Sequence, residues 1–142
     1  MIRIVLADDH RVVRAAIRSL LDKAADIKVV GEADNGVEAL RLVKELLPDV
    51  LLLDMEMPGM TGVDVARHLQ AAGVPVCILV LSAYDDKQYT LGMLASGASG
   101  YLLKEDAPKM LIDAVRAVAC GERGWVSQRV AAQAAVWTQE RE

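Results

Sequence analysis

The fold is decided by the stretch Ile2-Arg3-Ile4-Val5-Leu6-Ala7 and by the two carboxylates that follow it, Asp8 and Asp9. The stretch is short, mostly apolar and rich in Ile, Val and Leu, which is typical of a buried strand. After it, apolar residues recur every three or four positions, as they do in an amphipathic helix. A buried strand that ends on two charges and leads into a helix indicates the start of a βαβ unit.

The same alternation of apolar runs and periodic stretches continues to about residue 120. Most of the runs are continuously apolar, which indicates parallel strands buried on both faces by helices. We expect an α/β protein with a flavodoxin-like, doubly wound, five-stranded parallel sheet in the order 2-1-3-4-5, five helices and a C-terminal linker helix. The predicted strands are Ile2–Ala7, Lys28–Ala33, Val50–Leu53, Val76–Leu81 and Gly100–Leu103.

Composition excludes several classes of protein. The 142 residues, 54% of them hydrophobic, suffice for one core but not for two full domains. The net charge is -4 and the basic residues are scattered among acidic ones, which argues against nucleic-acid binding by this chain alone. We find neither a leader pattern nor an apolar run of roughly 20 residues, so we expect a cytoplasmic protein without membrane contact. Cys77 and Cys120 lie in apolar patterns and are predicted to be reduced core residues.

Polar residues stand repeatedly at the ends of the predicted strands. Because parallel strands end at one edge of their sheet, we expect these residues to converge where such sheets bind ligands. They are Asp8, Asp9, Asp54, Ser82 and Lys104.

Three carboxylates at one edge repel one another unless they bind a cation or protonate. Oxygen ligands suit Mg²⁺, which accepts a few carboxylates together with a substrate phosphate. Lys104 and Ser82 could then hold phosphoryl oxygens, so the pattern predicts a pocket built around a phosphoryl group. His10 is expected to face solvent in the first helical turn, and we leave it outside the site.

Four motifs, in this order and spacing, resemble the receiver domain of bacterial two-component response regulators. They are ADDH at residues 7–10, LLLDMEMPGMTG at 51–62, LSAY at 81–84 and GYLLK at 100–104. The resemblance implies that Asp54 accepts a phosphoryl group from a phosphohistidine on a sensor histidine kinase. It also implies that the chain is no general enzyme and catalyses only its own phosphotransfer and autodephosphorylation.

The resemblance assigns further roles residue by residue. The implied Mg²⁺ ligands are Asp8, Asp9, Asp54 and the backbone carbonyl of Glu56. Lys104 would form an ion pair with the phosphate, while Ser82 and Tyr101 would form the conformational switch. On phosphorylation, Ser82 would move toward the phosphate and the ring of Tyr101 would turn inward.

One departure from the family pattern indicates a subgroup. Many receivers have proline directly after the conserved lysine, whereas here Glu105 follows Lys104. This form resembles the NarL/FixJ subgroup, whose receivers precede a LuxR-type helix-turn-helix. We expect a receiver at residues 1–121 and a helical linker at 122–142, because the final TQERE resembles the start of that DNA-binding domain. The resemblance implies a homodimer on phosphorylation, and DNA contact only through a domain missing from this chain.

Two other function classes stay open at this point. A Mg²⁺-dependent phosphatase would use Asp54 as nucleophile and would want an acid/base carboxylate two residues later, where Glu56 stands. A receiver-length chain offers no cap domain for such a substrate. A module that binds partners without phosphorylation is the second alternative, although such modules ordinarily lack part of the acidic cluster or the lysine.

Overall fold

A computed structural model describes residues 1–83, 97–122 and 125–126, the last pair through its backbone alone. The helix predicted between the fourth and fifth strands and the predicted linker helix both fall largely on residues outside these ranges. They therefore stay predictions.

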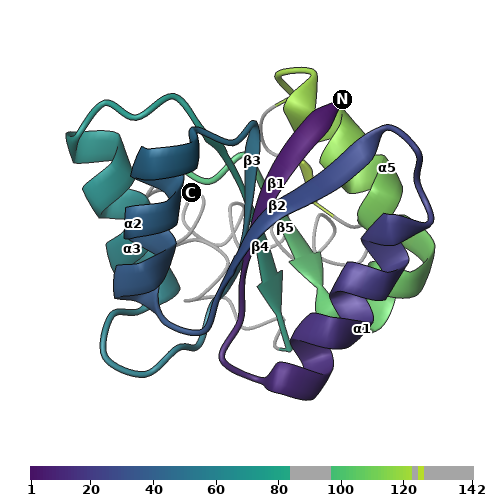
Figure 1. Cartoon of the computed structure of the whole chain (residues 1–142), viewed down its shortest axis with the longest axis horizontal. Helices are drawn as coiled ribbons and strands as arrows, with labels where there is room; N and C mark the ends of the chain where they lie inside the picture. Colours follow the sequence, from purple (N-terminus) through teal and green to yellow (C-terminus); the bar gives the residue numbers. More distant parts are fainter. Residues whose placement is uncertain (84–96, 123–124, 127–142) are drawn as a thin grey trace, which may run out of the picture.

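A parallel sheet forms the middle layer of the molecule (Figure 1). Its strands lie in the order β2-β1-β3-β4-β5-β6. The first five strands confirm the predicted order 2-1-3-4-5, and each neighbouring pair is parallel. Their bounds lie within one residue of those predicted. The strands are β1 (Ile2–Ala7), β2 (Ile27–Ala33), β3 (Val50–Asp54), β4 (Cys77–Ser82), β5 (Gly100–Leu103) and β6 (Trp125–Val126).

Helices cover both faces of this sheet. In Figure 1, α2 and α3 lie on one side of the strands and α1 and α5 on the other. A single-turn helix, η1, connects β5 to α5. The bounds are α1 (Arg11–Asp22), α2 (Gly36–Leu46), α3 (Gly62–Ala71), η1 (Lys104–Asp106) and α5 (Ala107–Ala119).

The sixth strand was not predicted. β6 is parallel to β5, with Gly100 opposite Trp125 and Tyr101 opposite Val126. The start of the segment expected to be a helical linker is therefore strand at these two residues. A two-residue strand is too short to show a period of two, and its pairing depends on a neighbour about 25 residues earlier in the chain.

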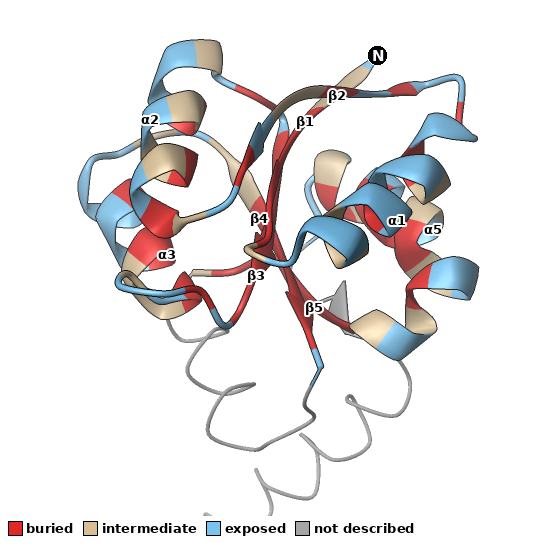
Figure 2. Ribbon diagram, turned by 60° about the horizontal axis from the view of Figure 1, so that its bottom comes forward, coloured by how far each residue is buried: buried red, intermediate tan, exposed pale blue. Residues whose placement is uncertain are grey.

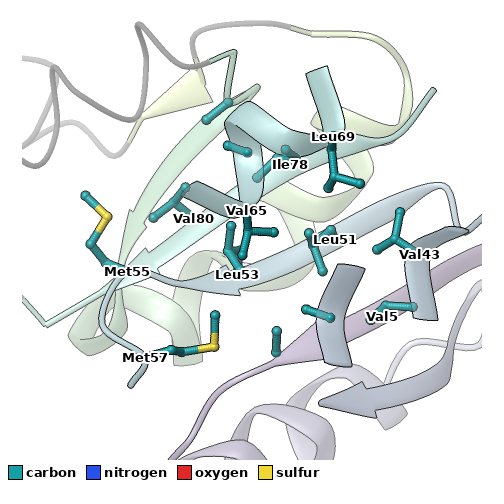
Figure 3. Packing of buried hydrophobic residues seen from close by; sticks show 14 of the residues in the cluster. Val5, Val43, Leu51, Leu53, Met55, Met57, Val65, Leu69, Ile78 and Val80 are labelled. Carbon is teal, nitrogen blue, oxygen red and sulfur yellow. The ribbon is translucent and has the colours of Figure 1, made fainter. Parts of the chain in front are cut away.

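Two apolar layers hold the helices to the sheet, and strand residues alternate between them. On the α2 and α3 side, Val5, Leu51 and Leu53 pack with Val43 and with helix α3 (Figure 3). On the α1 and α5 side, the intervening strand residues pack with both helices. In Figure 2 the inner strands β3, β4 and β5 are almost wholly buried, whereas β2 is partly exposed, as are the outer faces of the helices. The continuous apolar character of the strands thus reflects burial on both faces.

The loop between β3 and α3 is held by close backbone contacts. Thr61 and Asp64 form a capping box that starts α3. A Cβ added at Gly62 would lie 3.0 Å from the carbonyl oxygen of Asp54. A Cβ added at Gly36, the first residue of α2, would lie 2.8 Å from the Cβ of Met60. Both glycines therefore let the loop approach the ends of β3 and α2 closely.

Two remaining expectations concern solvent and membrane. Cys120 is exposed at the end of α5, so the prediction that it lies in the core was wrong; Cys77 is half-buried, and both are free thiols. The apolar period of α5 simply ends one position before Cys120.

Among the described helices, we find no segment of the length and apolar character needed to cross a membrane.

Candidate functional site

The carboxyl ends of four strands meet at one edge of the sheet, and each supplies a polar side chain. Asp8 directly follows β1, Asp54 ends β3, Ser82 ends β4, and Lys104 directly follows β5. The first three are buried, with exposed fractions of 1%, 3% and 0%. Buried polar groups at the ends of apolar strands require partners, because desolvation without a partner costs free energy.

Lys104 supplies one partner for two of the carboxylates. Its Nζ lies 3.1 Å from Oδ2 of Asp8 and 3.2 Å from Oδ1 of Asp54. The same Oδ1 accepts a hydrogen bond of 3.3 Å from the backbone N–H of Glu56. The ammonium group therefore bridges the ends of β1 and β3.

One ammonium does not neutralise this cluster. Burial raises the pKa of Asp54 to about 6, and the negative charge of Asp8 adds to the rise, although Lys104 opposes it. For Lys104 itself, burial alone would lower the pKa, but attraction to Asp54 and then to Asp8 raises it overall. The ammonium is thus firmly charged, while the Asp54 carboxylate is held in an unfavourable environment.

Several carboxylate oxygens in the cluster have room for a cation. Among the described residues, Oδ2 of Asp8, Oδ1 of Asp9 and Oδ2 of Asp54 are buried and accept no hydrogen bond, although Lys104 lies near the first. Ligand atoms of Asp8, Asp9 and Asp54 all lie within 4.8 Å of one another. An all-oxygen donor set of this kind fits Mg²⁺. The predicted carboxylate ligands are therefore brought together, whereas the carbonyl of Glu56 stays a predicted ligand.

The loop from β1 to α1 is fixed by contacts that sequence reasoning missed. The backbone N–H of His10 donates to Oδ1 of Asp8 over 2.8 Å. Arg14 Nη1 donates to the backbone carbonyl of Asp8 over 2.6 Å, and its Nε lies 3.3 Å from Oε1 of Glu32 on β2. An arginine one turn into a helix carries no signal for such a role, because the contact depends on how the loop turns back.

The two predicted switch residues lie in the interior. Ser82 and Tyr101 are each 0% exposed, and Tyr101 belongs to the apolar layer on the α2 and α3 side. The ring of Tyr101 therefore already lies inward in this structure. Tyr84, part of the LSAY motif, lies outside the described residues.

Two hollows adjoin the acidic cluster. One, of about 300 Å³, is lined by residues that include Asp54, Ser82 and Lys104. The other, of about 410 Å³, is lined largely by apolar side chains of the β3–α3 loop, together with Asp9. His10 lines both hollows, and its side chain is 66% exposed. Asp9 and Asp54 thus each line a hollow with room for a small group, whereas Asp8 lines neither.

Comparison with protein families gives one assignment for most of the chain. Residues 4–116 match the response regulator receiver domain. The chain is 37% identical over 136 residues to the response regulator UvrY of Escherichia coli K12, covering 96% of this chain and 62% of that protein. It is 40% identical over 121 residues to the transcriptional regulatory protein YxjL of Bacillus subtilis, covering 85% and 56% respectively. The chain thus spans little more than half the length of these curated relatives.

Solved structures agree with this assignment. The signal receiver domain of NarL from Mycobacterium tuberculosis superposes with a TM-score of 0.83 at 40% identity, covering 85% of this chain and 98% of that one. A LuxR-family two-component response regulator from Aurantimonas sp. SI85-9A1 gives a TM-score of 0.90 at 33% identity, covering 99% and 98%.

Proposed function

Because this chain belongs to the response regulator receiver family, we propose that it is the phosphoacceptor part of a transcriptional regulator, with Asp54 as the phosphorylated residue. The observation that carries the proposal is the meeting of Asp54, Asp8 and Lys104, with Lys104 Nζ within 3.2 Å of both carboxylates. We assign residues 1–121 to the receiver and 122–142 to a linker. The phosphoryl donor is a phosphohistidine of a sensor histidine kinase.

Asp8, Asp9 and Asp54 would hold Mg²⁺, with the backbone carbonyl of Glu56 as a further ligand. Three buried carboxylate oxygens that accept no hydrogen bond among the described residues support this set, although Lys104 is ion-paired with the one on Asp8. When bound, the ion would neutralise charge that develops on the transferred phosphoryl oxygens. Asp8→Asn and Asp9→Asn should each weaken Mg²⁺ binding about tenfold or more, because each removes a charged ligand.

In the transfer step, a carboxylate oxygen of Asp54 attacks the phosphorus of the phosphohistidine. An O–P bond forms as the P–N bond breaks, and the bonding electron pair leaves with the imidazole, which takes up a proton. Lys104 already lies 3.2 Å from Oδ1 of Asp54, so its ammonium can follow the charge onto the phosphoryl oxygens. The other groups of the pocket mainly position these reactants.

The acyl phosphate would act on the switch pair. It adds roughly -1.5 to -2 charges and strong acceptor oxygens, by analogy with other protein phosphates. Ser82 at the end of β4 would donate its hydroxyl to one of those oxygens. We propose that this contact stabilises the inward position of Tyr101, which the ring already occupies here. The surface around β5 and α5 would then change its preference for a second copy of the chain.

Dimerisation would be the output of this switch. Two copies would place attached DNA-binding domains on paired half-sites, which is how helix-turn-helix dimers read DNA. The names of the relatives, which include transcriptional regulatory proteins, support this output.

The test is incubation with Mg²⁺ and phosphoramidate followed by intact-mass measurement. The wild type should gain one phosphoryl group, and Asp54→Asn should gain none. Asp49→Asn is the matched control, because Asp49 directly precedes β3 and so lies at the opposite end of the strand that Asp54 terminates. It should label at the wild-type rate. Undiminished labelling of Asp54→Asn would move the site elsewhere, and no labelling of the wild type would favour a module that binds without phosphorylation.

A further inference from the structure

His10 occupies the N-cap position of α1 without capping it. Its backbone is extended, and its side chain makes no hydrogen bond to the first turn. Asp, Asn, Ser and Thr are the residues that cap helices well, and histidine is not among them. The side chain instead lines both hollows that adjoin the acidic cluster.

The imidazole nitrogen is close to two of the carboxylates. His10 Nδ1 lies 3.0 Å from Oδ1 of Asp9 and 3.6 Å from Oδ1 of Asp8. Among the described residues, Oδ1 of Asp9 accepts no hydrogen bond, so the 3.0 Å contact lacks hydrogen-bond geometry. Two ligands of one ion, each about 2.1 Å from it and at right angles, are about 3.0 Å apart. The spacing therefore matches two ligands of a shared cation.

The remaining ligands are within reach of the same point. The ligand atoms of His10 and of the three aspartates all lie within 4.8 Å of one another. Opposite ligands of an ion with bonds of about 2.1 Å are about 4.2 Å apart, so small side-chain movements close the site. Oδ2 of Asp54, whose side chain is almost wholly buried, has no hydrogen-bond partner among the described residues and points to the need for a cation.

We propose that His10 is an additional metal ligand that adapts this acidic site to imidazole-binding transition-metal dications, which compete there with Mg²⁺. Carboxylates alone suit Mg²⁺, whereas an imidazole beside them suits Ni²⁺, Cu²⁺ and Zn²⁺. Mg²⁺ keeps its waters and prefers oxygen, so His10 contributes nothing to its affinity. The same residues form the proposed site of phosphotransfer, so this inference rests on the proposed placement of Mg²⁺. The test of the inference, however, measures metal binding alone.

The experiment is a calorimetric titration of the wild type, His10→Ala and His10→Asn with Ni²⁺ and, separately, with Mg²⁺. Asn keeps a residue that is favoured at helix N-caps, so a loss common to both variants is due to the imidazole. We expect Ni²⁺ affinity to fall tenfold or more in both variants, while Mg²⁺ affinity changes less than twofold. His68→Ala is the matched control, since His68 is the only other histidine of the chain and lies exposed on α3. It should change neither affinity.

A second titration with Ni²⁺ in excess Mg²⁺ locates the ion. Excess Mg²⁺ should weaken apparent Ni²⁺ binding to the wild type, and Asp9→Asn should weaken it as well. Unchanged Ni²⁺ affinity in the His10 variants, an equal loss of Mg²⁺ affinity, or Ni²⁺ binding indifferent to Mg²⁺ would each overturn the proposal. A chain that binds Ni²⁺ through His10 but takes up no phosphoryl group would refute the proposed function and leave this inference standing.

Discussion

At the amino end of the sheet, one arginine is paired with one exposed carboxylate, whereas at the carboxyl end two buried carboxylates share one ammonium. Arg116 of α5 donates two hydrogen bonds of 3.0 Å to Asp26, just before β2. Its hydrogen bond lowers the pKa of Asp26, whereas burial raises that of Asp54 to about 6. The charged form of an aspartate is thus stabilised at one end of the sheet and destabilised at the other.

A bound ligand can therefore act on stability mainly at the carboxyl end of the sheet. A satisfied pair at the amino end gains little from any further partner. At the carboxyl end, a cation or a phosphoryl group that binds relieves repulsion already present in the folded chain, and its binding is coupled to stability. When no divalent metal is present, removal of a carboxylate should therefore stabilise the chain at the carboxyl end and change its stability little at the amino end.

The largest effect is expected from removal of the ammonium. Lys104→Ala should lower the free energy of unfolding by about 2–4 kcal/mol at pH 7, because Asp8 and Asp54 lose their buried counter-charge. Urea denaturation in the presence of a chelator measures the loss. Lys109→Ala, an exposed lysine on α5, is the control and should change little. A loss no larger than that of the control would mean that the carboxylates are neutral in the free protein.

Asp54→Asn should have the opposite sign. A carboxyl whose pKa is raised from 3.8 to about 6 on folding binds more protons in the folded state between these values, so its contribution to stability declines as pH rises through that window. At pH 7 the Asn variant should be about 1–3 kcal/mol more stable than the metal-free wild type. The gap should close toward pH 4. Paired urea titrations at pH 4.5 and 7 measure it, and a gap that widens at low pH would contradict the raised pKa.

Gly62→Ala tests the backbone of the same edge. The added methyl would press on the carbonyl oxygen of Asp54 and on Met55, both backbone contacts of 3.0–3.2 Å that yield poorly. We expect a loss of about 1–2 kcal/mol, although helix propensity alone would favour alanine. Gly31→Ala is the control, because its methyl would meet the tip of the Leu46 side chain. Denaturation curves compare the two, and an equal or smaller loss for Gly62→Ala would show that the loop adapts.

The smallest effect is expected at the amino end. Asp26→Asn breaks an exposed pair with Arg116, so the unfolding transition at pH 7 should barely move, and added salt should reduce even that change. The same denaturation measurements at low and high salt test this. A shift as large as that of Lys104→Ala would remove the contrast between the two ends of the sheet.

Much of this contrast could be predicted from sequence, and the reason is local. Asp8, Asp54, Ser82 and Lys104 each terminate an apolar run, and parallel strands necessarily end together, so position along the chain sufficed to bring them to one edge. The strand order followed from the alternation of strands and helices. No comparable rule predicts which side chains of a helix or its preceding turn reach the site.

The contacts that sequence reasoning missed depend on the conformation of the turn between β1 and α1. Arg14 reaches the Asp8 carbonyl from the first turns of α1, and the side chain of His10 folds back onto that of its sequence neighbour Asp9 in the turn that enters α1. The sequence predicts a solvent-facing position for His10 in the first helical turn, and it carries no signal for the role of Arg14. The exposure of Cys120 was missed for a related reason, since an apolar period does not indicate where its helix ends.

The short strand β6 has a consequence for how the chain avoids aggregation. An uncovered strand at the border of a sheet presents backbone donors and acceptors to other molecules and can nucleate uncontrolled assembly. By pairing with Gly100 and Tyr101, the chain uses its own later segment to shield the start of β5. A fragment that ends before Trp125 would expose that border, and we expect it to be less soluble during refolding than the full chain.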